Sequence, residues 1–159
     1  MRKQLIPFAL SIFVLLLSFS SPKAQPADPI KLKENLFSVD FVDGTHGWAV
    51  GYFGKIIHTK DGGKSWTHQQ SGTDKLLSSV DFVDRDNGWV VGSGSTVLHT
   101  TDGGATWIPQ KITEDILLTS VCFADARKGW TAGEWGTIFY TENGGKTWIK
   151  QFSGDDAIL

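Results

Sequence analysis

The sequence predicts an all-β fold, a β-propeller of three four-stranded blades, because it carries an internal repeat of the size of one blade. Two sets of tryptophans recur with a constant step of 41 residues, and no gap is needed to align the copies. They are Trp48, Trp89 and Trp130, and Trp66, Trp107 and Trp148. A propeller blade is a sheet of four short strands in about 40 residues with periodic glycine and tryptophan. A single β-sandwich is the alternative, but a sandwich has no reason to keep a constant step.

The first residues are typical of a secretory signal peptide. Arg2 and Lys3 precede an apolar run over residues 5–19, and small residues follow. The run is shorter than the roughly 20 residues that an uncleaved transmembrane anchor needs. We therefore expect residues 1–24 to be a signal peptide and the protein to be exported, to the periplasm or the extracellular space.

Two cleavage sites fit the sequence, one after Ser20 and one after Ala24. Residues 25–35 then form an N-terminal linker. Removal of residues 1–24 leaves 12 basic and 17 acidic side chains, a net charge near −5. This charge argues against nucleic acid or an anionic membrane surface as the main partner.

The repeat divides the rest of the chain into three blades. Blade 1 is expected over residues 36–76, blade 2 over 77–117 and blade 3 over 118–158, so that residue 159 begins a fourth blade that is absent. Propellers have about four to eight blades. We therefore expect the chain either to be a fragment of a larger ring or to close a ring by self-association, two copies giving six blades.

Within blade 1, short strands alternate with turns rich in glycine. The pattern of apolar and polar residues predicts strands over residues 36–42, 48–50, 55–59 and 65–69. The last two strands are joined by Asp61-Gly62-Gly63, a tight hairpin signal. The other two blades repeat this order.

The hairpin between the third and fourth strands carries the most specific motif, which reads TKDGGKSW, TTDGGATW and TENGGKTW in the three blades. A short acidic side chain at the turn accepts hydrogen bonds from the N–H groups that follow, and paired glycines supply positive φ. The tryptophan is expected to bring its apolar face over the hairpin and into the gap between blades, which would exclude water from those bonds. We expect structural, not catalytic, roles, since every blade needs this turn and a catalytic group is needed once. The residues are Asp61, Gly63, Trp66, Asp102, Gly104, Trp107, Asn143, Gly145 and Trp148.

This hairpin resembles the Asp-box, or bacterial neuraminidase repeat, of sialidases and several other propellers, which indicates an architecture and not a function. The wider pattern, VDFVD from Val39, GWAVG from Gly47 and GKIIHT from Gly54, is similar to the photosystem II stability and assembly factor family and its exported bacterial relatives. The resemblance covers residues 36–159. It implies a ring of about seven blades, a scaffold without catalysis or cofactor, and a protein partner, such as an assembling membrane-protein subunit.

A glycoside hydrolase built on Asp-box blades, like a sialidase, is the alternative function. A sialidase needs three arginines to hold the substrate carboxylate, but the mature chain has only Arg85 and Arg127. Other glycosidases need two neighbouring carboxylates, and Glu134 lacks an evident partner. We therefore expect no enzymatic activity and no small-molecule substrate.

The histidines and the cysteine are candidates for metal binding and for thiol reactivity. His58 and His99 recur 41 residues apart, but a pair on different blades with no third ligand falls short of a zinc site. We expect strand histidines whose hydrogen bonds are satisfied, and no metal. Cys122 occupies the position of Asp40 and Asp81, and we expect a small buried residue instead of a reactive thiol.

Turn tips that vary between blades mark positions that the blade does not dictate. Between the second and third strands lie Tyr52 and Phe53 in blade 1 and Trp135 in blade 3, whereas blade 2 has Ser-Gly. Aromatic residues on a propeller rim are candidate partner contacts, and packing of each ring on its own blade is the alternative. Arg85 and Arg127 form a small basic group on the opposite edge, either a second contact or solvated surface.

Overall fold

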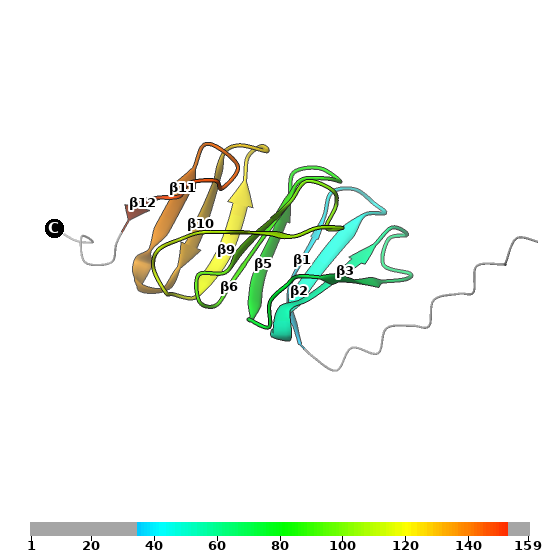
Figure 1. Cartoon of the computed structure of the whole chain (residues 1–159). Coiled ribbons are helices and arrows are strands. Elements are labelled where there is room, and N and C mark those ends of the chain that lie inside the picture. Colours follow the sequence, from blue (N-terminus) through cyan, green and yellow to red (C-terminus); the bar gives the residue numbers. More distant parts are fainter. Residues whose placement is uncertain (1–34, 153–159) are drawn as a thin grey trace, which may run out of the picture.

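The computed structural model describes residues 35–152 and confirms the predicted architecture. Three four-stranded antiparallel sheets stand side by side in chain order, as the blades of a partial propeller do (Figure 1). The signal peptide, nearly all of the linker and residue 159 lie outside the described residues. None of the helices in the described part is long and apolar enough to span a membrane.

Each sheet is a meander in which consecutive strands are neighbours. Blade 1 holds β1 (Leu36–Phe41), β2 (Gly47–Gly51), β3 (Lys55–Thr59) and β4 (Thr67–Gln70). Blade 2 holds β5 (Leu77–Phe82), β6 (Gly88–Gly92), β7 (Val97–Thr100) and β8 (Ile108–Gln110). Blade 3 holds β9 (Leu118–Phe123), β10 (Gly129–Gly133), β11 (Ile138–Thr141) and β12 (Ile149–Phe152). Two 3-10 turns, η1 (Tyr52–Gly54) and η2 (Glu134–Gly136), join the second and third strands of blades 1 and 3.

The strand predictions for blade 1 hold to within two residues at each end. The largest difference is β4, which begins at Thr67 and not at residue 65. The reason is local, because the Ser65 amide donates to Asp61 Oδ1 at 2.8 Å and is therefore kept in the turn.

The apolar core of residues 35–152 consists of two clusters, one in each gap between blades. Alternate residues of a strand face opposite sides of its sheet, so blade 2 contributes to both clusters. Val80, Val90 and Leu98 pack toward blade 1, whereas Val91 and Val97 pack toward blade 3. The first strands lie closest together, with β1 against β5 and β5 against β9.

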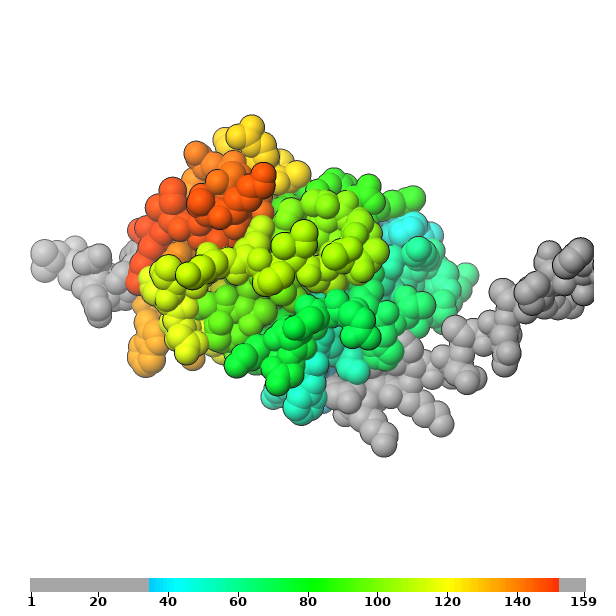
Figure 2. All heavy atoms as spheres, in the orientation of Figure 1, coloured from blue at the N-terminus to red at the C-terminus, as the bar shows by residue number. Residues whose placement is uncertain are grey.

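The connection from β8 to β9, residues 111–117, covers part of the second gap. It runs over the front of blades 2 and 3 in the space-filling view (Figure 2). Ile112 and Ile116 in this connection pack against the cluster between the two blades. The gap between blades 2 and 3 is therefore closed by a loop as well as by the sheets.

A phenylalanine at the end of each first strand explains the glycine that begins each second strand. Phe82 pairs with Gly88 across β5 and β6, and a Cβ at Gly88 would overlap the Phe82 ring. The same relation holds between Phe41 and Gly47 and between Phe123 and Gly129. Glycine thus lets the aromatic ring lie flat across the neighbouring strand.

Candidate functional site

Stacked aromatic rings join each blade to the next. Trp48 on β2 lies between His58 of its own sheet, 4.5 Å away, and Phe82 of blade 2, 3.6 Å away between ring centroids. Both rings lie within 10° of parallel to the indole. Trp107 then meets the Phe82 ring edge-on at 5.9 Å. Aromatic contacts of these kinds stabilise beyond the area that they bury.

The second interface repeats the first. Trp89 lies between His99 at 4.6 Å and Phe123 at 3.5 Å, and Trp148 meets Phe123 edge-on at 5.9 Å. Trp48 and Trp89 are fully buried. The first repeated tryptophan is therefore the centre of the contact between blades.

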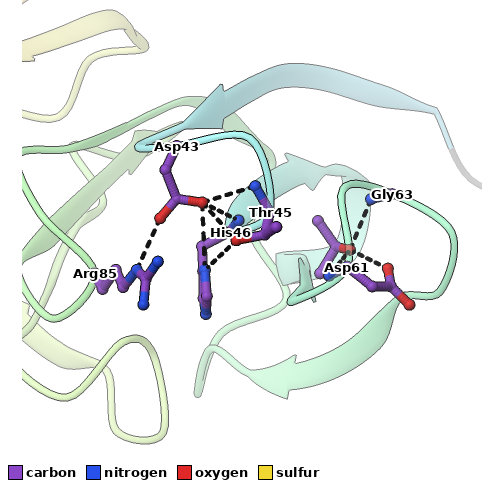
Figure 3. Close-up of polar contacts among 7 residues, drawn as sticks. Asp43, Thr45, His46, Asp61, Gly63 and Arg85 are labelled. Carbon is purple, nitrogen blue, oxygen red and sulfur yellow. Dashed lines mark hydrogen bonds and ion pairs between the residues drawn. The ribbon is translucent and has the colours of Figure 1, made fainter.

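Hydrogen bonds inside the turn close each Asp-box hairpin, and Figure 3 shows those at Asp61 and Gly63 in blade 1. Asp61 Oδ1 accepts from the Thr59 hydroxyl at 2.8 Å and from the Ser65 amide at 2.8 Å. The Thr59 hydroxyl also accepts from the Gly63 amide at 2.9 Å. Hydrogen bonds from Ser65, first from its hydroxyl, lower the pKa of Asp61 to about 2. Gly62 and Gly63 have φ of 72° and 84°, which a side chain would disfavour.

Blades 2 and 3 build the same hairpin with different side-chain chemistry. Asp102 accepts from the Thr106 amide at 2.8 Å and hydroxyl at 2.7 Å, and these bonds lower its pKa. Asn143 accepts from the Thr147 amide at 3.0 Å but donates through Nδ2 to the Thr147 hydroxyl at 2.8 Å. The neutral amide therefore replaces the carboxylate by reversing one hydrogen bond.

The expected exclusion of water is wrong for the bonds that the carboxylate accepts from Thr106, although the bond from the Gly104 amide to the Thr100 hydroxyl is buried. Asp102 is exposed, as are its hydrogen bonds to Thr106. Trp107 does lie in the gap between the blades, as expected, where it packs on Phe82 and donates to Gln69 Oε1 at 3.4 Å. Trp66 and Trp148 are half-buried. The tryptophan fills the gap between sheets and leaves the carboxylate in water.

Gln69, which lies outside the Asp-box motif and was not predicted as a site residue, binds the glycine pair of the next blade. Gln69 Nε2 and Trp48 Nε1 both donate to the Gly103 carbonyl, at 2.8 and 3.1 Å. A Cβ at Gly104 would overlap the Gln69 amide and displace it from this position, and the φ of 84° also favours glycine. Glutamines recur at positions 69, 110 and 151 with the 41-residue step, and this recurrence is the signal that identifies them.

Gln110 and Trp89 repeat this arrangement at the second interface, where both donate to the Gly144 carbonyl at 2.8 and 3.1 Å. Gly145 has the role of Gly104, because a Cβ there would overlap the Gln110 amide. The Asp-box turn of each following blade is therefore bound by the blade before it.

Aspartates on the first strands add a charged link between blades. Asp40 accepts from the Phe82 amide at 2.8 Å, and Asp81 accepts from the Phe123 amide at 2.7 Å. Burial raises the pKa of Asp81. Cys122 occupies the third position of this series and is exposed, so the expectation of a buried thiol is wrong. The reason is that it lies on the outer face of blade 3, which no described residue covers.

The predicted basic group on the Asp-box edge consists of Arg85 and Arg127, and Arg85 is paired with an aspartate. Arg85 Nε donates to Asp43 Oδ2 at 2.7 Å, which joins the first turns of blades 1 and 2 (Figure 3). Asp43 also accepts from the Thr45 hydroxyl and from backbone amides, and these bonds hold its pKa well below the usual range. Arg127 lies in the corresponding turn of blade 3, where its exposed backbone amide donates to Asp125 at 2.7 Å.

The opposite edge carries the aromatic turn tips in an unusual backbone conformation. Phe53 has φ 56° and ψ 39°, and Trp135 has φ 61° and ψ 28°, both in the left-handed region. The corresponding residue of blade 2 is Gly94, with φ 61°. Phe53 is 71% exposed and Trp135 is 78% exposed. Tyr52 differs, because its ring packs edge-on against Phe37 at 4.8 Å.

The two histidines are packing residues, but their hydrogen bonds are not satisfied. Nε2 of both His58 and His99 is buried and has no hydrogen-bond partner among the described residues, so that part of the expectation is wrong. Burial lowers the pKa of His58 to about 4, which keeps the ring neutral in its stack. Within residues 35–152, no group of three or more His, Cys, Asp or Glu side chains is placed to hold a metal ion.

Comparisons with known proteins accord with this geometry. Residues 23–107 and 65–153 match the sequence profile of the family described as "Photosynthesis system II assembly factor YCF48". A solved structure of YCF48 bound to D1 peptide is 26% identical, with a TM-score of 0.71 over 80% of this chain. YCF48 from Cyanidioschyzon merolae is 28% identical, with a TM-score of 0.69 over 82% of this chain. This chain spans 44% of the length of each of those two. No curated protein sequence matches it.

Proposed function

The chain belongs to the photosynthesis system II assembly factor YCF48 family, and from this premise we propose that it is an exported, non-catalytic scaffold that binds a segment of a membrane-protein subunit. The binding surface is the rim formed by η1, η2 and the corresponding turn of blade 2. We call this surface the aromatic rim. Its contact residues are Phe53 and Trp135, with Tyr52 supporting Phe53 from the side.

The observation that carries the proposal is the left-handed backbone at Phe53 and Trp135. A bulky residue in that region costs about 1 to 3 kcal/mol, and strain of this kind is concentrated at functional sites. Gly94 shows that the same turn forms without a side chain. The two aromatic rings are exposed as well, so they contribute little to the stability of their own blades. Binding to a partner explains both the strained backbone and the exposure of two large apolar rings.

A protein ligand is supported by the structural neighbour that is bound to D1 peptide. Exposed aromatic rings bury a large apolar area at a small cost in side-chain entropy, which suits a peptide segment. The mature chain is acidic overall, which disfavours nucleic acid as a competing ligand. The proposal is therefore a peptide segment of a membrane protein and not a nucleic acid or a small molecule.

The proposal has two further parts: the protein does not catalyse a reaction, and it is exported. Asp61 and Asp102 are bound within their own hairpins, and Arg85 is paired with Asp43. These side chains therefore stabilise the fold, which supports a structural and not a catalytic role. Export is supported by the signal-peptide pattern of residues 1–24. The blades that complete the ring are supplied by further repeats or by a second copy of this chain.

The test places a photoreactive amino acid at position 53 or 135 of the protein in cells of the source organism. Position 108 is the matched control, because Ile108 is also exposed and apolar but lies on β8, away from the rim. We expect cross-links from positions 53 and 135 to one membrane-protein subunit, identified by mass spectrometry, and none from position 108. The double variant Phe53→Gly, Trp135→Gly tests the same site in vitro with synthetic D1 peptide and with the cross-linked segment. Equal binding by this variant and the wild type would overturn the rim as the site.

A further inference from the structure

Blade 1 has a face that no other blade of residues 35–152 covers, and this face matches covered faces elsewhere in the same part of the chain. Phe41 and Val39 on β1 correspond to Phe82 and Val80 on β5, one repeat later. Phe82 and Val80 are buried by blade 1, whereas Phe41 is 42% exposed and Val39 is 59% exposed. We call this surface of blade 1 the leading face. In the two interfaces of the structure, such a face is covered by the sheet of another blade.

Blade 3 has a face of the complementary kind, which no blade among the described residues covers and which we call the trailing face. Trp130 and Tyr140 occupy the positions of Trp48 and His58, and their rings lie 5.0 Å apart. Trp48 is fully buried because Phe82 covers its second side. Trp130 is 38% exposed. The aromatic stack of blade 3 therefore lacks the phenylalanine that the leading face of blade 1 presents.

The polar groups of the two faces match in the same way. At both interfaces a tryptophan and a glutamine of one blade donate to the first glycine carbonyl of the next Asp-box turn. Trp130 and Gln151 hold these donor positions on the trailing face, and Gly62 holds the acceptor position on the leading face. In addition, Ser38 Oγ accepts from the Val80 amide at 3.3 Å. Ser120 and the Val39 amide correspond to this pair.

We propose that the trailing face of one copy docks on the leading face of a second copy, repeating the contact between blades. Trp130 then stacks on Phe41 of the second copy, and Trp130 and Gln151 donate to the Gly62 carbonyl of the second copy. Two such contacts close a ring of six blades, and a contact of this head-to-tail kind forms either a closed ring or an open chain. The inference rests on the part of the proposed function in which a second copy completes the ring. It does not depend on the aromatic rim.

One mismatch makes the new contact weaker than the contacts within the chain. Cys122 replaces the aspartate that accepts from the phenylalanine amide in the other two interfaces. The amide of Phe41 would therefore lack its charged acceptor. Association is expected to depend on protein concentration, and it buries Cys122, the only cysteine of the chain.

The test uses two variants, each of which blocks one face of the purified, exported protein. Val39→Asp adds a charge to the leading face, and Trp130→Asp adds one to the trailing face. Analytical ultracentrifugation should show that the wild type associates and that each variant alone stays monomeric. An equimolar mixture should form a heterodimer, because the intact trailing face of Val39→Asp meets the intact leading face of Trp130→Asp. Ile108→Asp is the control and should associate like the wild type, because Ile108 stays exposed beside a neighbouring blade.

Three outcomes would overturn the proposal: a wild type that is monomeric at every concentration, a single variant that dimerises alone, or a mixture that stays monomeric. Circular dichroism melts establish that the variants are folded. If a variant is not folded, the rate of Cys122 alkylation in the unaltered protein tests the proposal. This rate should fall as the protein concentration rises, because association buries the thiol. An unchanged rate contradicts the proposal. Because the rim cross-links use other positions, failure of association leaves the test of peptide binding intact.

Discussion

Trp48 and Phe82 lie face to face across the first gap between blades, with ring centroids 3.6 Å apart and ring planes 10° from parallel. Trp48 belongs to β2 and Phe82 to β5, so this contact joins two blades and not two strands of one sheet. It places Trp48, one of the largest fully buried side chains among the described residues, at the contact between repeats. Stability is therefore expected to depend most on residues whose neighbours lie in another blade.

The first prediction concerns Trp107, which is buried against the edge of Phe82. Trp107→Ala should lower the free energy of unfolding by about 3 to 5 kcal/mol, because it opens a cavity between blades 1 and 2. Trp66→Ala is the matched control, since Trp66 has the same motif position but is only half-buried on the leading face. Chemical denaturation of dilute protein should show a clearly smaller loss for Trp66→Ala. Equal losses would show that Trp107 does not act through the gap between blades.

The second prediction concerns the acidic residue of the Asp-box. Asp102→Ala should cost about 1 kcal/mol, the usual value for the loss of an intramolecular hydrogen bond. The exposed Thr106 donors bond to water when the carboxylate is removed, so most of the loss comes from the buried Thr100 hydroxyl, which donates to Asp102 Oδ1 at 2.7 Å. Asp102→Asn should cost less than Asp102→Ala, since Asn143 makes the corresponding bonds in blade 3. Urea titration of the three proteins tests this order, and a less stable Asn variant would contradict it.

The third prediction is a pH dependence that arises from His58. Burial lowers the pKa of His58 to about 4 in the folded protein, against about 6.5 for an unfolded chain. The unfolded state therefore binds more protons between these values, and stability falls as the pH drops from about 6.5 toward 4. His58→Tyr, which places in blade 1 the residue that blade 3 has at position 140, should reduce this slope. Melting temperatures across this pH range test the prediction, and unchanged slopes would contradict it.

The fourth prediction separates strain from binding at the aromatic rim. Phe53→Gly and Trp135→Gly should leave stability unchanged or raise it by up to about 1 kcal/mol, because glycine adopts the left-handed conformation without strain. Phe53→Ala is the control, since it removes the ring but keeps the strain. Thermal melts should rank Phe53→Gly above Phe53→Ala. If both glycine variants are strongly destabilised, the rings serve their own blades and not a partner.

The blade architecture could be predicted because one repeat contains everything that a four-stranded sheet needs. The hairpin of Asp61, Gly63 and Ser65 is likewise local to seven neighbouring residues. The contacts between blades could not be predicted in this way, because Gln69 and Gly103 lie 34 residues apart and meet only in the assembled fold. The exposure of Cys122 could not be predicted for the same reason, because it depends on contacts between blades. A repeat indicates which residues are equivalent but not which copies have a neighbour.

The last prediction turns the mismatch at Cys122 into a gain of affinity. Cys122→Asp restores the acceptor that Asp40 and Asp81 supply to the following blade at 2.8 and 2.7 Å. If the trailing face docks on the leading face of a second copy, the new carboxylate accepts from the Phe41 amide of that copy. A hydrogen bond to a charged group contributes about 1.5 kcal/mol or more, and burial of the carboxylate offsets part of this gain.

We therefore expect the dissociation constant of Cys122→Asp to fall by about two- to tenfold, since 1.4 kcal/mol corresponds to a factor of ten. Sedimentation equilibrium over a dilution series measures this constant. Cys122→Ser is the control, because it removes the thiol and supplies no charge, and it should bind like the wild type. An aspartate that weakens association relative to serine would show that position 122 does not face the first strand of a second copy.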